Sequence, residues 1–265
     1  MKQQLEYKPE YKIVFIGAGN VATHLSLALQ QNGCSILQVY SKTELSASVL
    51  GKMLQVPYST SLSEINPDAD IYIFSVKDSV LVDCISKMPK VKGILVHTAG
   101  SIPLSVFDGF THRAGVLYPL QTFSKSRKVL FTEIPIFIEA FNKKDEDLLS
   151  ELANLISKNV SILSSEKRKY LHLSAIFACN FVNHLYDLAS QVLEEQNLSF
   201  DILLPLIKET AAKVCEMTPR EAQTGPAVRY DNLIIQQHIE LLTDENKKKI
   251  YEMLSQSICS LKIIM

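Results

Sequence analysis

The sequence predicts an α/β domain with a doubly wound parallel sheet over residues 1–163, followed by an all-helical domain over residues 164–265. In the first part, short β-branched apolar runs alternate with helix-like stretches. This rhythm is typical of βαβ units whose sheet is covered by helices on both faces. After Ser164 the strand-like runs end and long helical patterns follow, which marks the domain boundary.

The expected strands of the first part share an apolar, β-branched composition. They cover residues 11–17, 35–41, 70–76, 93–100, 114–120 and 134–140, and a last run at 159–163 closes the domain. An amphipathic helix is expected over 143–158, because its leucines recur with a period near 3.6. Expected helices of the second part cover 168–196, 200–217, 230–242 and 245–261, with Pro219 and Thr224–Pro226 marking a loop.

The composition excludes several classes of protein. With 47% hydrophobic and 21% charged residues, the 265-residue chain is expected to fold into a globular structure. Because 27 basic residues stand against 28 acidic ones, no overall positive field would hold a nucleic acid. No apolar run reaches the roughly 20 residues of a membrane-spanning helix, and the start MKQQLEYKPEYK lacks an apolar signal core. We therefore expect a cytoplasmic protein without a nucleic-acid or membrane partner.

The five cysteines are scattered, without a CxxC pair or a histidine at zinc-finger spacing. We expect them to be small buried hydrophobic residues and predict no metal site. Free thiols fit a reducing compartment.

A glycine-rich turn follows the first expected strand in YKIVFIGAGNVATHLSLAL. It matches G-x-G-x-x-A between a strand and a helix, the context that dinucleotide binding in a Rossmann domain requires. A small residue is needed for the turn itself, for approach to a diphosphate and for helix packing, and Ala22 is expected to open the helix. The diphosphate would meet the free amides of the helix start. Residues expected to bind the cofactor here are Gly17, Gly19, Asn20, Val21 and Ala22.

The end of the second expected strand indicates which nucleotide binds. NAD-binding domains usually place an acidic residue there, whereas this strand ends in Ser41-Lys42-Thr43. Lys42 can pair with a 2′-phosphate and the two hydroxyls can donate to it, so NADP(H) is favoured over NAD(H). The missing acid also argues against a methyltransferase. The alternative interpretation is a polar loop with an ordinary surface lysine.

Two further strand ends are expected at the same edge, because ligands of open α/β sheets lie outside the carboxyl ends of the strands. One should line the adenosine ribose and diphosphate, with Asp78 capping the next helix; the other should leave room for the nicotinamide. The residues concerned are Ser75, Val76 and Lys77 in the first, and Thr98, Ala99 and Gly100 in the second. Turn chemistry alone could also explain such residues.

These segments resemble a known family. The residues that carry the resemblance are GAGNVATHL, VYSKT, SVKDS, HTAGS, YPLQTF, HLSAIFACNF, LPLIKET, TGPAVRYDNL and QQHIELL, which span nearly the whole chain. The family is described as NADP oxidoreductases with a Rossmann domain similar to that of pyrroline-5-carboxylate reductase and a helical carboxyl-terminal domain of unknown function. The resemblance implies this fold and a homodimer formed through the helices, but no particular substrate.

One departure from the wider superfamily concerns catalysis. Its 6-phosphogluconate and 3-hydroxyacid dehydrogenases use a lysine four residues before an asparagine, whereas here Ile176 precedes Asn180 at that spacing. Chemistry of that type is therefore doubtful unless His172, two turns earlier on the same broad face, transfers the proton. Pyrroline-5-carboxylate reductases lack this lysine, so a lysine-free site can still transfer hydride.

The candidate catalytic residues are polar groups expected to face the cofactor. His172 is the expected proton donor, since histidine changes charge near neutral pH, although it could be a hydrogen-bonded core residue. Tyr118 and Gln121 leave a strand end and could bind substrate. A buried Asn180 needs a partner, from packing or from a ligand. Arg229 could clamp a carboxylate or pair with Asp231.

We expect an NADP(H)-dependent oxidoreductase that transfers hydride to a C=O or C=N bond of a small, carboxylated metabolite. The alternative is a non-catalytic NADPH-binding sensor or regulatory protein. The helix from Leu171 to Leu185 is apolar almost all round, so a second copy of the chain is expected to cover it.

Overall fold

The computed structural model describes residues 10–260. Residues 1–9 of the segment MKQQLEYKPEYK, which lacks an apolar signal core, lie outside this range. Residue 261, the last of the helix expected over 245–261, lies outside it as well. The chain divides into two compact units, the first ending at Ile176 and the second beginning at Phe177. Each is described by itself.

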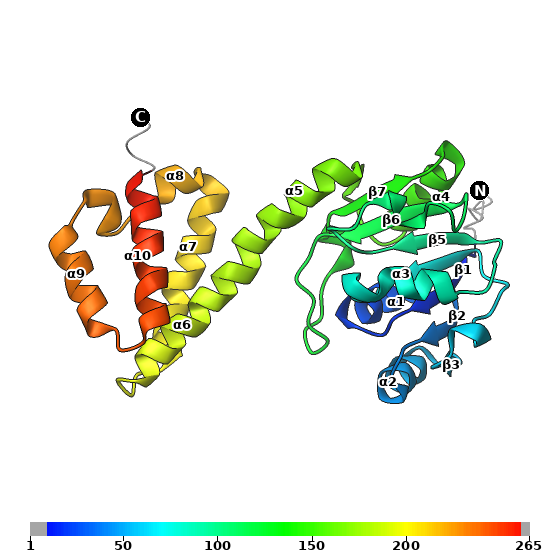
Figure 1. The fold of residues 1–265 in the computed structure, drawn as a ribbon, viewed down its shortest axis with the longest axis horizontal. Helices are drawn as coiled ribbons and strands as arrows, with labels where there is room; N and C mark the ends of the chain where they lie inside the picture. The colour runs from blue at the N-terminus through cyan, green and yellow to red at the C-terminus, as the bar shows by residue number, and fades with distance from the viewer. Residues whose placement is uncertain (1–9, 261–265) are drawn as a thin grey trace, which may run out of the picture. The chain divides into compact units, whose positions relative to one another are not determined.

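The first unit contains one sheet of eight strands in the order β3-β2-β1-β4-β5-β6-β7-β8 (Figure 1). The bounds of the strands are β1 Lys12–Ile16, β2 Ser35–Tyr40, β3 Tyr58–Ser59, β4 Ile71–Phe74, β5 Ile94–His97, β6 Ala114–Pro119, β7 Ile136–Ala140 and β8 Val160–Ile162. Strands β1 to β6 are parallel. The doubly wound α/β fold is confirmed.

Two features of the sheet differ from the expectation of a parallel sheet made of the seven predicted strands. Strand β7 runs antiparallel to β6, because the chain between them returns through a loop and the short 3-10 helix η3 (Phe131–Glu133) instead of a crossover helix. Strand β8 is parallel to β7. Strand β3 was not predicted, since two residues are too few to show an alternating pattern.

Helices cover both faces of the sheet. One face packs on α1 (Asn20–Gln31), α2 (Glu44–Leu54) and α4 (Lys143–Asn154), and the other on α3 (Asp78–Lys87) with the 3-10 helices η1 (Leu62–Glu64) and η2 (Leu104–Phe107). Successive strand residues point to opposite faces: Ile13 and Phe15 enter the first core, Val14 and Ile16 the second. Helix α1 begins at Asn20, two residues before the expected Ala22.

A continuous helical segment crosses the boundary between the units. It consists of α5 (Ser165–Ala175), the π-helix η4 (Ile176–Phe181) and α6 (Val182–Glu194). The predicted single α-helix over 168–196 is therefore interrupted. Because π-type bonds join residues five apart, the α-helical spacing that would place His172 and Asn180 on one face does not apply across η4.

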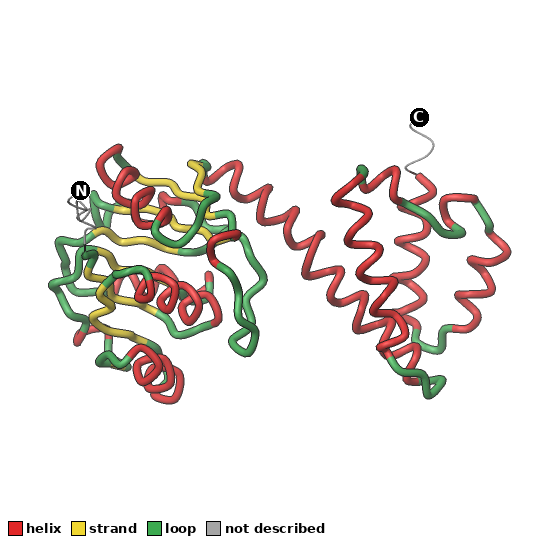
Figure 2. The backbone as a smooth tube through the Cα atoms, turned by 180° about the vertical axis from the view of Figure 1, so that it is seen from behind, coloured by secondary structure: helices red, strands yellow, loops and turns green. Residues whose placement is uncertain are grey.

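The second unit is all helical, as Figure 2 shows in red for this part of the chain. After α6 it contains η5 (Phe200–Leu203), α7 (Leu204–Glu216), α8 (Pro219–Ala222), η6 (Ala227–Arg229), α9 (Asn232–Leu241) and α10 (Glu245–Ser260). Pro219 was expected in a loop, but it opens α8, where a proline without an N–H is tolerated and Thr218 closes a capping box with Glu221.

The burial of the cysteines was predicted only in part. Cys34 and Cys84 are buried in the first unit, and Cys259 is partly buried in the second. Cys179 and Cys215 are exposed in the single chain, so the expectation that all five are buried is wrong for these two. No helix among residues 10–260 has the length and apolar character needed to cross a membrane.

Candidate dinucleotide site

The carboxyl ends of β1, β2, β4, β5 and β6 form one edge of the sheet, because these strands are parallel. Each cofactor-binding residue predicted from the sequence follows one of the first four strands, and Tyr118 lies near the end of β6. The topology therefore brings these segments to the same edge, where ligands of such sheets bind.

The turn after β1 needs glycine at its first position. Gly17 has φ +119°, and a Cβ added there would lie 2.3 Å from the carbonyl oxygen of Ser75. An added Cβ on Gly19 meets no atom within 4 Å, so the space beside this residue is open. The turn is thus tight against the protein at Gly17 and accessible at Gly19.

The start of α1 presents free backbone donors. Gly19 is the N-cap, its carbonyl accepts from the Thr23 amide at 3.0 Å, and no side chain caps the helix. Within residues 10–260, the amides of Asn20, Val21 and Ala22 have no acceptor. The first turn contains no acidic residue that would repel an anion. These features fit a diphosphate.

The segment that follows β2 contains a lysine, Lys42, that forms no ion pair among the described residues. The Ser41 amide donates to the Ser59 carbonyl at 3.2 Å, and the Thr43 hydroxyl donates to the Ser46 hydroxyl at 2.8 Å. Lys42 is exposed and takes part in none of the ion pairs formed among the described residues. Its ammonium is therefore available to a ligand at this strand end.

The segments after β4 and β5 are joined by hydroxyl groups. Thr98 donates from its amide to the Phe74 carbonyl at 3.1 Å and from its hydroxyl to that of the buried Ser75 at 3.3 Å. The expected capping role of Asp78 is wrong: Lys77 is the N-cap of α3, and the Asp78 carboxylate accepts instead from the Ser101 hydroxyl. That bond ties the two segments together a second time.

A compact cluster at this edge consists of Gly100, Tyr118 and His172. We call the side chains of His172 and Tyr118 the histidine–tyrosine pair. The Tyr118 hydroxyl lies 2.9 Å from Nδ1 of His172, and the two rings meet edge to face. A Cβ added to Gly100 would lie 2.6 Å from His172 Nδ1 and 2.9 Å from the Tyr118 ring. Gly100 therefore lets the two side chains approach the loop after β5.

The protonation state of Tyr118 follows from its burial. Burial raises the pKa of Tyr118 to about 12, while the charge of Arg168 acts in the opposite direction. The phenol thus stays protonated, and it can donate to Nδ1 of His172 or accept from it, depending on the tautomer of the ring.

Helix α5 is fastened to the sheet by a buried ion pair that the sequence did not reveal. Arg168 is 1% exposed and binds the Glu139 carboxylate of β7 at 2.6 Å. The same arginine donates to the Ile102 carbonyl at 2.7 Å, and Ser165 donates to Glu139 from both its amide and its hydroxyl. Because His172 lies one turn after Arg168, these bonds set its position at the sheet edge.

A second histidine at this edge, His97, is excluded as a proton donor. His97 is fully buried at the end of β5, and burial together with the charge of Arg168 lowers its pKa to about 3. Its Nδ1 accepts from the Ala99 amide at 3.2 Å. His97 is therefore a neutral structural residue at physiological pH.

Of the other predicted site residues, Gln121 belongs to the first unit, and Asn180 and Arg229 belong to the second. Gln121 is exposed, and its side-chain oxygen accepts from the Thr122 amide at 2.7 Å. Asn180 is exposed on η4, so it is not the buried amide that was expected. Arg229 lies on η6 and does not pair with Asp231, whose carboxylate caps α9 by accepting from the Ile234 amide.

The fold and the glycine turn define the class: a Rossmann protein built to bind a dinucleotide. One family model, described as "NADP oxidoreductase coenzyme F420-dependent", matches residues 12–99, and another, a domain of unknown function (DUF2520), matches residues 134–258. The crystal structure of "putative NADP oxidoreductase BF3122" from Bacteroides fragilis is 48% identical, with a TM-score of 0.90 over 95% of this chain and 98% of that one. The chain belongs to this family of NADP oxidoreductases, and NADP(H) is its cofactor.

More distant structures share the fold. Protein TM1727 from Thermotoga maritima is 19% identical, with a TM-score of 0.76 over 94% of this chain and 99% of that one. A 1-pyrroline-5-carboxylate reductase from Streptococcus pyogenes is 12% identical (0.62; 95% and 99%), and an imine reductase from Myxococcus stipitatus in complex with NADP+ is 16% identical (0.63; 95% and 92%). The expected likeness to pyrroline-5-carboxylate reductase is confirmed. A search of curated proteins finds no match.

Replacing Glu139 by glutamine should destabilise the protein by about 3–5 kcal/mol at neutral pH, because the buried Arg168 loses its counter-charge. The carboxyl is partly buried, which alone would raise its pKa, but hydrogen bonds from Ser165 and Arg168 hold the pKa below its usual value. Its contribution to stability is therefore complete above about pH 4.3, the unfolded value, and is lost as the pH falls through the folded one.

Urea unfolding at a series of pH values measures both effects. The free-energy difference between the wild-type protein and Glu139→Gln should shrink below about pH 4. Asp147→Asn is the matched control, since Asp147 is 58% exposed in a surface pair with Lys143 and should cost at most about 1 kcal/mol. An equal, small effect for both variants would contradict a buried pair.

Proposed function

We propose that the protein is an NADP(H)-dependent reductase that transfers hydride to a C=O or C=N bond of a small, carboxylated metabolite. The observation that supports this most strongly is the histidine–tyrosine pair beside Gly100, at the edge of the sheet where the cofactor belongs. When bound, the cofactor supplies the hydride. The protein must then bind and orient the reactants and deliver a proton.

Binding of the cofactor is assigned to the residues predicted from the sequence. In this proposal the diphosphate is held by Gly17, Gly19, Asn20, Val21 and Ala22; the 2′-phosphate by Ser41, Lys42 and Thr43; and the remainder by Ser75, Val76, Lys77, Thr98, Ala99 and Gly100. The free amides of α1 and the unpaired Lys42 support these roles. Asn180, Gln121 and Arg229 stay predictions for substrate binding.

Delivery of the proton is assigned to His172. Its Nδ1 is bonded to the Tyr118 hydroxyl, so Nε2 is the ring nitrogen assigned to the proton transfer. When the charged ring gives up its Nε2 hydrogen, the Nδ1 hydrogen remains and is donated to the Tyr118 oxygen, which keeps the ring in one orientation. Tyr118 is thus a positioning residue, and the ion pair of Arg168 with Glu139 supports the helix that carries the histidine.

The alternative is a non-catalytic NADPH-binding protein that reports the redox state of the nucleotide pool. Ile176, where related dehydrogenases place a lysine, favours this reading. Oxidation of NADPH, followed by absorbance across keto acids and cyclic imines, separates the two functions. Turnover supports the reductase, whereas tight NADPH binding without turnover of any compound supports the sensor.

His172→Ala should lower the turnover rate by about 10²–10⁴-fold while changing the NADPH dissociation constant little, because the proton donor is lost and the phosphate-binding residues remain. Tyr118→Phe should lower the rate less, since the imidazole stays but loses its orienting bond. His112→Ala is the control, because His112 is exposed before β6, at the opposite edge of the sheet. An undiminished rate in His172→Ala would remove this histidine from the mechanism.

Lys42→Glu should weaken NADPH binding far more than NADH binding, because a carboxylate would repel the 2′-phosphate that only NADPH carries. Isothermal titration with both nucleotides measures the ratio of dissociation constants. Lys52→Glu, a substitution near the other end of the following helix, controls for the change in net charge. Equal losses for NADPH and NADH would show that Lys42 does not read the 2′-phosphate.

We also propose that two copies of the chain associate through the helical unit. In residues 177–260 of the single chain, Ala227 is the one buried hydrophobic residue, while Phe177, Phe181 and Leu185 are exposed. An all-helical unit with so little buried apolar surface lacks the main source of folding stability. A second copy that covers these side chains would supply it.

Sedimentation equilibrium at micromolar concentration should give about twice the mass of one chain. Phe181→Glu should weaken association and lower thermal stability together, because it places a charge on the covered face. Glu216→Gln, at the exposed end of α7, serves as the control. A wild-type monomer at this concentration would overturn the proposed dimer.

A further inference from the structure

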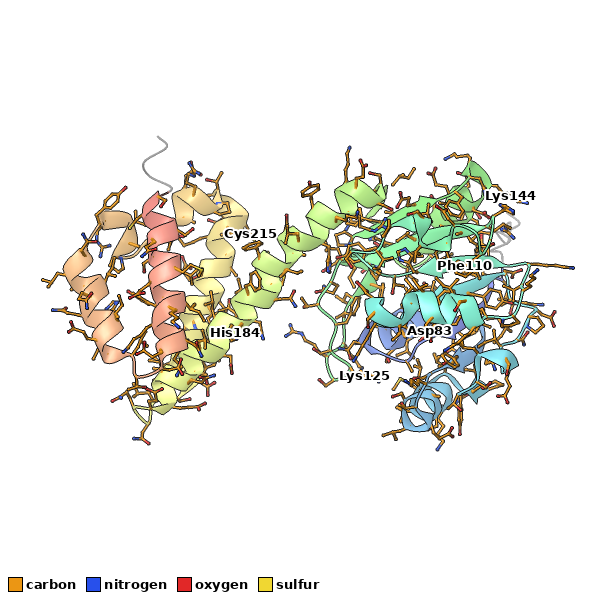
Figure 3. The ribbon with its side chains drawn as sticks, in the orientation of Figure 1. Asp83, Phe110, Lys125, Lys144, His184 and Cys215 are labelled. Carbon is orange, nitrogen blue, oxygen red and sulfur yellow. The ribbon has the colours of Figure 1, made fainter. Side chains whose placement is uncertain are left out.

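The loop that follows β6 carries a cluster of positive charge. Residues 121–128, QTFSKSRK, are called here the basic loop, and they include Lys125, Arg127 and Lys128. All three cations are exposed, and none of them takes part in an ion pair formed within residues 10–260. Figure 3 labels Lys125 at the tip of this loop. The positive charge of the basic loop is therefore not neutralised by an ion pair within the described residues.

Two side chains of α1 hold the basic loop. Asn20, the first residue of the helix, donates from Nδ2 to the Phe123 carbonyl at 2.7 Å. His24, one turn later, lies with Nε2 2.9 Å from the Ser124 carbonyl, and since a carbonyl only accepts, Nε2 is the donor. Both bonds join the loop to the first two turns after the glycine-rich turn.

Ring contacts anchor the same loop in the core. The Phe123 ring stacks on His24 with centroids 5.5 Å apart and on Phe131 with centroids 5.8 Å apart. Phe131 is buried in the core beneath α1 and α4. The loop thus has a defined place against α1, and the cations follow directly after the anchored residues Phe123 and Ser124.

Positive charge predominates around the start of α1 and the basic loop. The first turn of α1 contains no acidic residue and ends in free amides, which carry the positive end of the helix dipole. The basic loop adds its cations to the same region, where like charges repel unless an anion lies between or beside them. Such an arrangement stabilises a multiply charged anion.

We propose that the basic loop is a second phosphate-binding element of the dinucleotide site, in which Lys125, Arg127 and Lys128 bind the diphosphate that the amides of α1 receive. The inference rests on the proposed assignment of the diphosphate to the glycine-rich turn. The diphosphate is favoured over the 2′-phosphate because Asn20 and His24 tie the loop to α1, whereas the 2′-phosphate is assigned to Lys42 at the end of β2.

The test replaces Lys125, Arg127 and Lys128 together by glutamine and measures the dissociation constants of NADPH and NADH by titration at low and high salt. We expect both nucleotides to bind at least about tenfold more weakly at low salt, by the same factor, because both contain the diphosphate. The difference in affinity between this variant and the wild-type protein should become smaller at high salt, because screening weakens interactions between exposed charges. His24→Ala, which releases one anchor of the loop, should cause a smaller loss of the same kind.

The control variant carries Lys12→Gln, Lys92→Gln and Lys144→Gln, three exposed lysines at the opposite edge of the sheet, so the change in net charge is equal. Unchanged affinities in the loop variant would overturn the inference, and so would a loss confined to NADPH, which would place the cations on the 2′-phosphate. Gly19→Val provides the reference without cofactor binding. If the wild-type protein bound neither nucleotide, the proposed function would fail as well, and the two failures are thereby distinguished.

Discussion

The structure of the first unit depends on the close approach of two backbones at Gly17. The carbonyl of Ser75 occupies the position that any side chain at Gly17 would need. The Gly17 amide donates to the Tyr40 carbonyl at 2.7 Å, and the Ser75 amide donates to the Ile16 carbonyl at 2.8 Å, so the turn is bonded to the strands on both sides. Helix α1 must then begin at the edge where β2 and β4 end. The free amides, the basic loop bonded to Asn20 and the open space beside Gly19 all follow from this one contact.

Much of the fold could be predicted because its determinants are local. The β-branched runs of the strands and the glycine spacing are visible in the sequence within about ten residues. The missed features depend on distant partners or on subtle hydrogen bonding. Strand β3 exists only because Tyr58 and Ser59 pair with β2. The π-helix within 176–181 has the apolar composition of an ordinary α-helix, and no local pattern marks the change in bonding.

The candidate site was predictable in its parts but not in its assembly. Gly100, Tyr118 and His172 were each selected for chemical character, and the fold brings them together. The pair of Arg168 with Glu139 was missed because 29 positions separate the two residues, and a charged residue in an amphipathic helix usually faces solvent. Asn180 was misjudged for the opposite reason: its apolar neighbours suggested burial, but those neighbours are themselves exposed in the single chain.

The reversal of β7 has a consequence for the route of the chain. Because β7 and β8 run against β6, the polypeptide leaves β8 heading away from the nucleotide edge. Helix α5 therefore starts beside Glu139, which pairs with Val116 in the interior of β6, and travels back until His172 reaches Tyr118. Had every strand pointed the same way, the helix would have departed from that edge at its first residue, and a histidine two turns along it would have been carried outward. One hairpin-like return thus determines which end of helix α5 reaches the carboxyl edge of the parallel strands.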